Sequence, residues 1–230
     1  MRILLIGEYS NVHATLAEGL RALGQQVTVV SNGDFWKDYP RDIDLSRRPG
    51  KWGGLAYLAK TMATLHKLRG YDVVQLINPM FLELKAERIA PIYKYLRKHN
   101  KKVFLGAFGM DYYWVHENIT RMPLRYSDFN IGNRLRNDEP AMRERRDWIG
   151  TAKESLNKMI AEACDGIIAG LYAYWACYGP LFPHKTTFIP FPIKPKTQPM
   201  AYQEGSAPHP LRLFIGISKG RSTYKNTNII

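Results

Sequence analysis

Cysteine is scarce in this chain of 230 residues, which has only Cys164 and Cys177. Two cysteines cannot build a disulfide framework, and these two do not stand at a spacing typical of metal ligands. Both lie in apolar surroundings, where a free thiol behaves as a small buried hydrophobe. We therefore expect two buried free thiols and a cytoplasmic location.

Long apolar runs are also absent. The apolar run that follows the first two residues is only Ile3–Ile6, which is too short for the apolar part of a secretory leader. The longest weakly polar stretch, Ile167–Phe182, is interrupted by two glycines and a proline. It falls short of the roughly 20 residues that a membrane span needs. We expect no transmembrane segment.

Acidic residues are outnumbered, with 20 Asp and Glu against 33 Lys and Arg, and the formal net charge is +13. Nucleic acid, anionic phospholipid and phosphate-bearing substrates are candidate partners, and a merely solvated basic surface is the alternative. No zinc-finger spacing, RNA-binding aromatic motif or helix-turn-helix signature accompanies the charge, which disfavours nucleic acid. We expect peripheral contact with an anionic membrane, at the inner face of the cytoplasmic membrane.

The opening of the chain carries the clearest pattern. Ile3–Ile6 predicts a buried strand, and Gly7–Asn11 breaks the apolar run. Leucines at helical spacing predict a helix from Val12 that ends at Gly24, and Val27–Val30 predicts a second strand. No Gly-x-Gly-x-x-Gly follows the first strand, which counts against a dinucleotide cofactor. Ligands bind outside the carboxyl ends of such strands, so the 7–11 loop is the first candidate site.

Strands and helices alternate in the rest of the chain. Strands are expected over 72–77, 102–105, 165–169 and 186–191, and helices over 53–69, 81–99, 149–163 and 171–178. Such alternation is typical of a parallel sheet with right-handed crossovers. We predict an α/β fold, a Rossmann-like parallel sheet with helices on both faces. Segment 31–50 reads as a turn-rich loop, and 120–147 as an irregular, partly ordered basic insert.

Proline is concentrated between 190 and 210, where six prolines exclude regular helix or sheet. A new apolar run, Leu211–Ile217, follows and predicts a strand. We therefore expect one domain over 1–192, an extended linker over 193–210, and the first strand and loop of a second domain over 211–230.

Three segments resemble the retaining GT-B glycosyltransferases. Leu16–Val30 resembles the first helix and second strand of that family, and Phe108–Asp111 is similar to its His-Gly-(Thr/Ser)-Asp loop. Gly216–Asn228 is similar to the Arg…Lys-Gly-x-Asp segment that opens the second domain of family 4 enzymes. The whole chain resembles bacterial capsular or lipopolysaccharide sugar transferases. Phe108 departs from the family's usual His, so a donor-sugar contact from that position is in question.

The resemblance implies the N-terminal, acceptor-side half of a GT-B fold and the start of its donor-binding half. It implies an enzyme that moves a sugar from a nucleotide-sugar donor to a polysaccharide or lipid-linked acceptor, without a metal or other cofactor. Residues 1–230 alone are then expected to be inactive. The alternative is a non-catalytic nucleotide- or phosphate-binding Rossmann module.

The resemblance also implies roles for individual residues. Asp111 is the expected catalytic residue, and capping of the loop is the alternative. Cations at the departing diphosphate stabilise the charge that develops there, and the expected donor-diphosphate group is Gly7, Lys219, Arg221 and Lys225. The expected acceptor and cleft group is Glu8, Tyr9, Ser10, Asn11, His13, Asn78, Phe108, Gly109 and Tyr112. For His13, a packing role remains the alternative.

Overall fold

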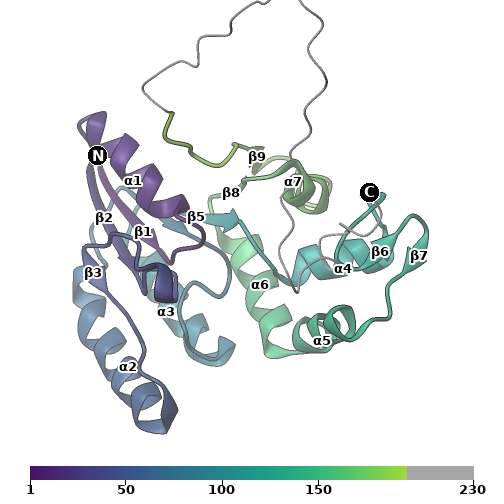
Figure 1. The fold of residues 1–230 in the computed structure, drawn as a ribbon. Coiled ribbons are helices and arrows are strands. Elements are labelled where there is room, and N and C mark those ends of the chain that lie inside the picture. The colour runs from purple at the N-terminus through teal and green to yellow at the C-terminus, as the bar shows by residue number, and fades with distance from the viewer. Residues whose placement is uncertain (196–230) are drawn as a thin grey trace, which may run out of the picture.

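The computed structural model describes residues 1–195 and contains a seven-stranded parallel sheet with the order β3-β2-β1-β4-β5-β8-β9 (Figure 1). Its strands are β1 Arg2–Ile6, β2 Gln26–Ser31, β3 Ile43–Asp44, β4 Val73–Leu76, β5 Lys102–Ala107, β8 Gly166–Ala169 and β9 Thr186–Phe188. A separate hairpin joins β6 Asn130–Ile131 to β7 Arg134–Leu135. The expected linker beyond 195, the strand over 211–217 and the phosphate-binding Lys219, Arg221 and Lys225 lie outside the described residues.

Helices cover both faces of the sheet, as predicted (Figure 1). They are α1 Val12–Ala22, α2 Gly50–Thr64, α3 Ala86–His99, α4 Tyr112–Thr120, α5 Glu139–Trp148, α6 Ala152–Ala163 and α7 Tyr172–Tyr178, with short 3-10 turns η1 Phe35–Lys37 and η2 Leu65–Lys67. Successive strand residues point to opposite faces. Leu5 therefore packs with Ala17 of α1, whereas Leu4 joins the larger core that contains Ile89 of α3 and Ile160 of α6.

The strand order reverses direction at β1, which lies between β2 and β4. Ile6 is paired with Val30 on one side and with Leu76 on the other, so three strands end at the same edge. A ligand crevice is expected at this switch point of an open parallel sheet. The fold therefore brings the loop after β1 beside the loops after β2 and β4.

Four local predictions were wrong. The expected insert over 120–147 is folded: it holds the β6–β7 hairpin and α5, which begins after Asp138 with its carboxylate accepting from the N–H of Ala141 at 3.2 Å. The pattern was missed because α5 buries only Ala141 and Trp148. The 81–99 helix begins at Ala86, and the last strand ends at Phe188. A short strand, β3, lies within the 31–50 segment.

The two cysteines are free and buried, as predicted. Burial raises the pKa of both thiols, so they stay protonated near neutral pH. Within residues 1–195, no helix is both long enough and apolar enough to cross a bilayer.

Gly7 ends β1 in a conformation that only glycine adopts easily, with φ of 88°. A Cβ atom at this position would lie 2.2 Å from Cγ2 of Ile77, and Ile77 is itself buried. The backbone N–H of Gly7 donates to the carbonyl of Val30 at 2.8 Å. Gly7 is thus fixed by its packing between β2 and β4.

We predict that Gly7→Ala lowers the free energy of unfolding by about 2–4 kcal/mol, from positive-φ strain and overpacking together. The matched control is Gly19→Ala in the middle of α1, where an added Cβ meets nothing within 4 Å. That variant should gain about 0.5–1 kcal/mol from helix propensity. Urea unfolding of both variants measures the difference, and equal midpoints for the two would contradict this account of Gly7.

Candidate functional site

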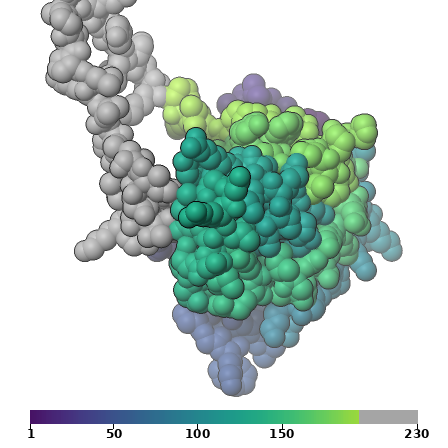
Figure 2. All heavy atoms as spheres, turned by 90° about the vertical axis from the view of Figure 1, so that its right-hand side faces the viewer, coloured from purple at the N-terminus to yellow at the C-terminus, as the bar shows by residue number. Residues whose placement is uncertain are grey.

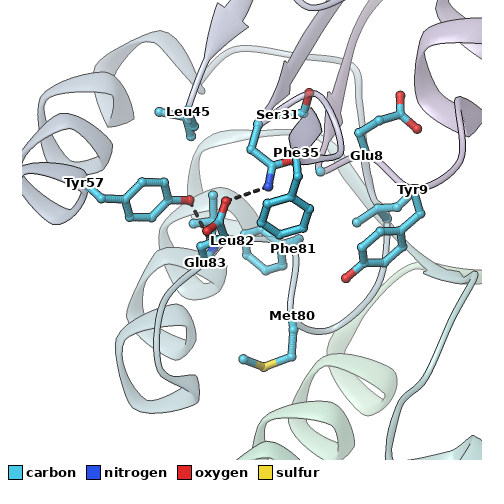
Figure 3. A pocket seen from close by; sticks show the side chains of 13 residues that line it. Glu8, Tyr9, Ser31, Phe35, Leu45, Tyr57, Met80, Phe81, Leu82 and Glu83 are labelled. Carbon is cyan, nitrogen blue, oxygen red and sulfur yellow. Dashed lines mark hydrogen bonds between the residues drawn. The ribbon is translucent and has the colours of Figure 1, made fainter. Parts of the chain in front are cut away.

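A pocket of about 120 Å³ lies at the switch point, lined by residues that follow β1, β2 and β4 and by Tyr57 of α2 (Figure 3). Phe81 and Leu82 form its apolar floor and are buried, whereas Phe35 stands at its edge with 64% of its surface exposed. Of the expected cleft group, Glu8 and Tyr9 line this pocket, as does Gly7.

The Glu8 carboxylate caps helix α1. The helix begins after Asn11, whose own side chain makes no capping bond. Instead Glu8 accepts from the backbone N–H of His13 at 3.2 Å and of Ala14 at 2.8 Å. Burial raises the pKa of Glu8, and these N–H groups oppose the shift. In Figure 3 the Glu8 carboxylate points away from Phe35.

This cap changes the expectation for Gly7. A helix N-terminus at the first loop of such a sheet is the usual anion site, because its free N–H groups point at the ligand. Here the protein's own Glu8 carboxylate takes those groups. Gly7 was expected to bring the backbone close to a donor diphosphate. In the structure, a glycine is needed at this position because a Cβ atom would clash with Ile77.

His13 is a packing residue. Its side chain is fully buried, and its Nδ1 lies 2.8 Å from the carbonyl oxygen of Gly7. Because a carbonyl only accepts, Nδ1 carries the hydrogen, and Nε2 is left to accept from the Gln75 amide 3.3 Å away. Burial lowers the pKa of His13 to about 4, so the ring is neutral at physiological pH. Of the two alternatives for His13, the structure favours packing.

The loops after β1 and β2 are tied together in strained conformations. Ser10, Asn11, Asp34 and Phe35 all have φ between 52° and 68°. The backbone N–H of Ser10 donates to the Asp34 carboxylate at 2.9 Å, and Lys37 pairs with the same carboxylate. Left-handed non-glycine residues persist only where their surroundings hold them, and they cluster at functional sites. Here they hold Phe35 at the edge of the pocket.

Tyr9 and Asn78 bring a hydrogen-bonding pair to the loops after β1 and β4. The Tyr9 hydroxyl contacts the Asn78 side chain, and burial raises the pKa of Tyr9 to about 12. Asn78 is 3% exposed, and its Oδ1 has no partner among the described residues. Gly109 packs against the Tyr9 ring, where a Cβ would lie 3.6 Å away. A buried acceptor without a partner is rare and costly.

Sequence reasoning missed four polar residues of the pocket, namely Ser31, Asn32, Tyr57 and Glu83. The Nδ2 of Asn32 donates to Oε1 of Glu83 at 2.5 Å, and the Tyr57 hydroxyl accepts from the backbone N–H of Glu83 at 3.1 Å (Figure 3). No Lys or Arg is among the described residues that line the pocket. The Asn32-Gly33 turn follows β2, and the loop after Pro79 follows β4. This position at the ends of strands was the one signal in the sequence that could have indicated these residues.

Asp111 is the N-cap of α4 and is fully buried. Its carboxylate accepts from the backbone N–H of Trp114 at 2.8 Å and from the Tyr178 hydroxyl at 2.8 Å. Burial raises its pKa to about 7, and the N–H of Trp114 opposes the shift. The structure therefore favours the capping alternative for Asp111 over direct contact with a substrate.

Phe108 and Tyr112 lie away from the pocket. The Phe108 ring packs edge-on against His13 and Phe191, with centroid separations of 6.4 and 5.2 Å. The backbone N–H of Tyr112 donates to Asn157 at 2.9 Å, and Lys158 lies 4.8 Å from the Tyr112 ring centre. Both residues serve the packing around α4 and β5 in the described structure.

The chain contains an Asp-x-Asp sequence, a pattern that can hold a metal–diphosphate complex. Its two carboxylates, Asp42 and Asp44, flank Ile43 at β3 and are both ion-paired. Asp42 lies 2.6 Å from Arg21, and Asp44 lies 2.7 Å from Arg41. Within residues 1–195, no group of three or more His, Cys, Asp or Glu side chains is arranged to hold a metal ion.

Comparison with known proteins does not assign the chain to a family. No model of a known protein family matches the sequence, and no curated protein matches it. A function is therefore inferred from the fold, the pocket geometry and the motifs in the sequence.

We predict a pH-dependent stability component from Asp111. The folded chain holds a proton there up to about pH 7, whereas the unfolded chain, with a pKa of 3.8, has lost it. Stability from this group is therefore full below pH 3.8 and is lost as pH rises toward about 7. Asp111→Asn is uncharged throughout and lacks this component.

Chemical unfolding of both proteins between pH 4 and 8 isolates the effect, because the opposing contribution of His13 is common to both. The wild type should lose on the order of a few kcal/mol relative to Asp111→Asn across this interval. A difference between the two that does not change with pH would contradict the protonated, buried state of Asp111.

Proposed function

We propose that this protein is a glycosyltransferase that uses a nucleotide-sugar donor, and that the pocket at the ends of β1, β2 and β4 holds the sugar of its acceptor. The observation that supports this most is the lining of the pocket. It combines a carboxylate–amide pair, Glu83 and Asn32, with the exposed ring of Phe35 and no cation among the described residues. The acceptor is a polysaccharide or a lipid-linked saccharide of the bacterial surface.

These groups suit a polyhydroxyl ligand. Glu83 has acceptor capacity beyond its one bond to Asn32. Sugar hydroxyls are donors as well as acceptors, and the apolar face of a sugar ring packs on an aromatic ring such as Phe35. Every group in the set therefore has a partner on a saccharide.

The alternative is a nucleotide- or phosphate-binding module without catalysis. A phosphate site needs cations or free N–H groups. The α1 N–H groups are taken by Glu8, and the pocket lining brings Glu83 rather than a Lys or Arg among the described residues. A phosphate would therefore face net negative charge in this pocket, which favours the saccharide over the alternative.

The donor side of the proposal rests on the resemblance in the sequence. Lys219, Arg221 and Lys225 are the groups proposed to stabilise the departing diphosphate, as cations do where charge develops in a transition state. Retention of the anomeric configuration is part of the same proposal. These roles are tested by measurements of transferase activity and not by measurements of ligand binding to the pocket.

We predict that saccharides bind this pocket through Phe35 and Glu83. Phe35→Ala should weaken binding about 10-fold by removing the stacking surface, and Glu83→Gln by a similar factor through loss of a charged acceptor. Isothermal calorimetry with a panel of mono- and disaccharides measures both. Trp36→Ala is the matched control, because Trp36 is the next residue, is 87% exposed and does not line the pocket.

Nucleoside diphosphates form the second arm of the same titration. Tight nucleotide binding that Glu83→Gln strengthens, with no saccharide response, would support the phosphate-binding alternative and overturn the acceptor pocket. Equal losses for Phe35→Ala and Trp36→Ala would also count against the pocket as the binding site.

A further inference from the structure

Helix α2 has a buried face and, on the opposite side, an exposed apolar face. Gly53, Tyr57, Thr61 and Thr64 are its buried residues and face the core. The opposite side carries Trp52, Leu55, Ala56, Ala59 and Met62, all exposed at intervals of three or four residues. Residues at this spacing lie on one face of a helix. We refer to these five residues as the outer face of α2.

The exposure of this face is unusual. Trp52 is 85% exposed, Leu55 58% and Met62 53%, so three large apolar side chains on this one face are exposed to water. Single exposed apolar residues are normal, but a contiguous stripe marks a surface that another phase or molecule covers. Helix α2 also projects from one end of the molecule, and the corresponding blue region protrudes in the space-filling view (Figures 1 and 2).

The charge around the outer face has one sign. Residues 45–71 contain no Asp or Glu and have six cations: Arg47, Arg48, Lys51, Lys60, Lys67 and Arg69. Lys60 pairs with Asp44, whereas the other five make no ion pair with any residue of the described part of the chain. Lys51 and Lys60 stand on α2 itself, on either side of the apolar stripe when positions are advanced by 100° per residue.

From this combination we propose that the outer face of α2 docks on an anionic phospholipid membrane. An apolar stripe with flanking Lys and Arg is typical of a helix that lies in the membrane interface, and Trp prefers the level of the headgroups. A second copy of the chain is a poorer occupant, because two-fold pairing would set this acid-free cationic segment against itself. Anionic headgroups complement it.

The docking surface extends the proposed function. It rests on that function only for the identity of the ligand, a lipid-linked saccharide, that the membrane would bring to the pocket. Tyr57 lies on the covered side of α2 and lines the pocket, so the same helix has lipid on one side and the pocket on the other. A lipid-linked saccharide would then have its lipid in the membrane and its sugar within reach of the pocket. Binding to vesicles needs no sugar, so this surface and the pocket succeed or fail separately.

The test is co-sedimentation of the full chain with vesicles of equal parts phosphatidylglycerol and phosphatidylcholine, against vesicles of phosphatidylcholine alone. The wild type should prefer the anionic vesicles, and the preference should fall with added salt. Trp52→Ser with Leu55→Ser should reduce binding about 10-fold. Leu23→Ser with Tyr172→Ser is the matched control, because both residues are exposed and lie outside α2.

Charge is tested separately. Arg47→Gln with Arg48→Gln and Lys51→Gln should weaken binding about 100-fold, at roughly 1 kcal/mol for each cation near the surface. The control removes the same charge from α3, with Arg88→Gln, Lys94→Gln and Lys98→Gln, all exposed. Thermal unfolding followed by circular dichroism checks that each variant is folded.

Three outcomes would overturn the proposal. The first is equal binding of the wild type to neutral and anionic vesicles, and the second is a loss of binding in the α3 control as large as that in the α2 charge variant. Sedimentation velocity supplies the third. A wild-type dimer that Trp52→Ser with Leu55→Ser converts to a monomer, without any lipid preference, would assign the outer face to a second copy of the chain.

Discussion

The Glu8 carboxylate at the N-terminus of α1 decides how this sheet edge is used. In many sheets of this topology the free N–H groups at that position receive a phosphate. Here they are hydrogen-bonded to Glu8, and the preceding Gly7 is held between β2 and β4 by its packing against Ile77. The pocket lies between the loops after β1, β2 and β4 and not at the helix end.

The order of the main-sheet strands and of most helices was predictable because each of these elements has a local signal, whereas helix α4, Tyr112–Thr120, was not predicted. Ile3–Ile6 reads as a buried strand, and the leucines of α1 recur at the helical period. Helix α5 was not predictable in the same way, since its residues are mostly charged and only Ala141 and Trp148 are buried. The fold class needs only the strong elements, which is why it was predicted correctly despite that error.

The candidate site was predictable in position but not in composition. Strand ends place Glu8, Tyr9 and Asn78 at one edge, and the structure brings all three together there. Glu83 and Asn32 join them through a hydrogen bond between residues 51 positions apart, which no local pattern reveals. The burial of Asp111 is likewise a tertiary property, because its carboxylate accepts from Tyr178 in a distant segment, and Asn157 holds that same hydroxyl. A motif can indicate such a residue but not its exposure.

The central claim is that this edge of the sheet takes a saccharide and not a phosphate, and amide NMR tests it most directly. Titration with a saccharide should shift the side-chain amide resonances of Asn32. The backbone amide resonances of His13 and Ala14 should stay unchanged, because these N–H groups are hydrogen-bonded to Glu8. A nucleoside diphosphate should shift neither set. Movement of the His13 and Ala14 amides on addition of the diphosphate would contradict the account, since it would mean that phosphate displaces Glu8.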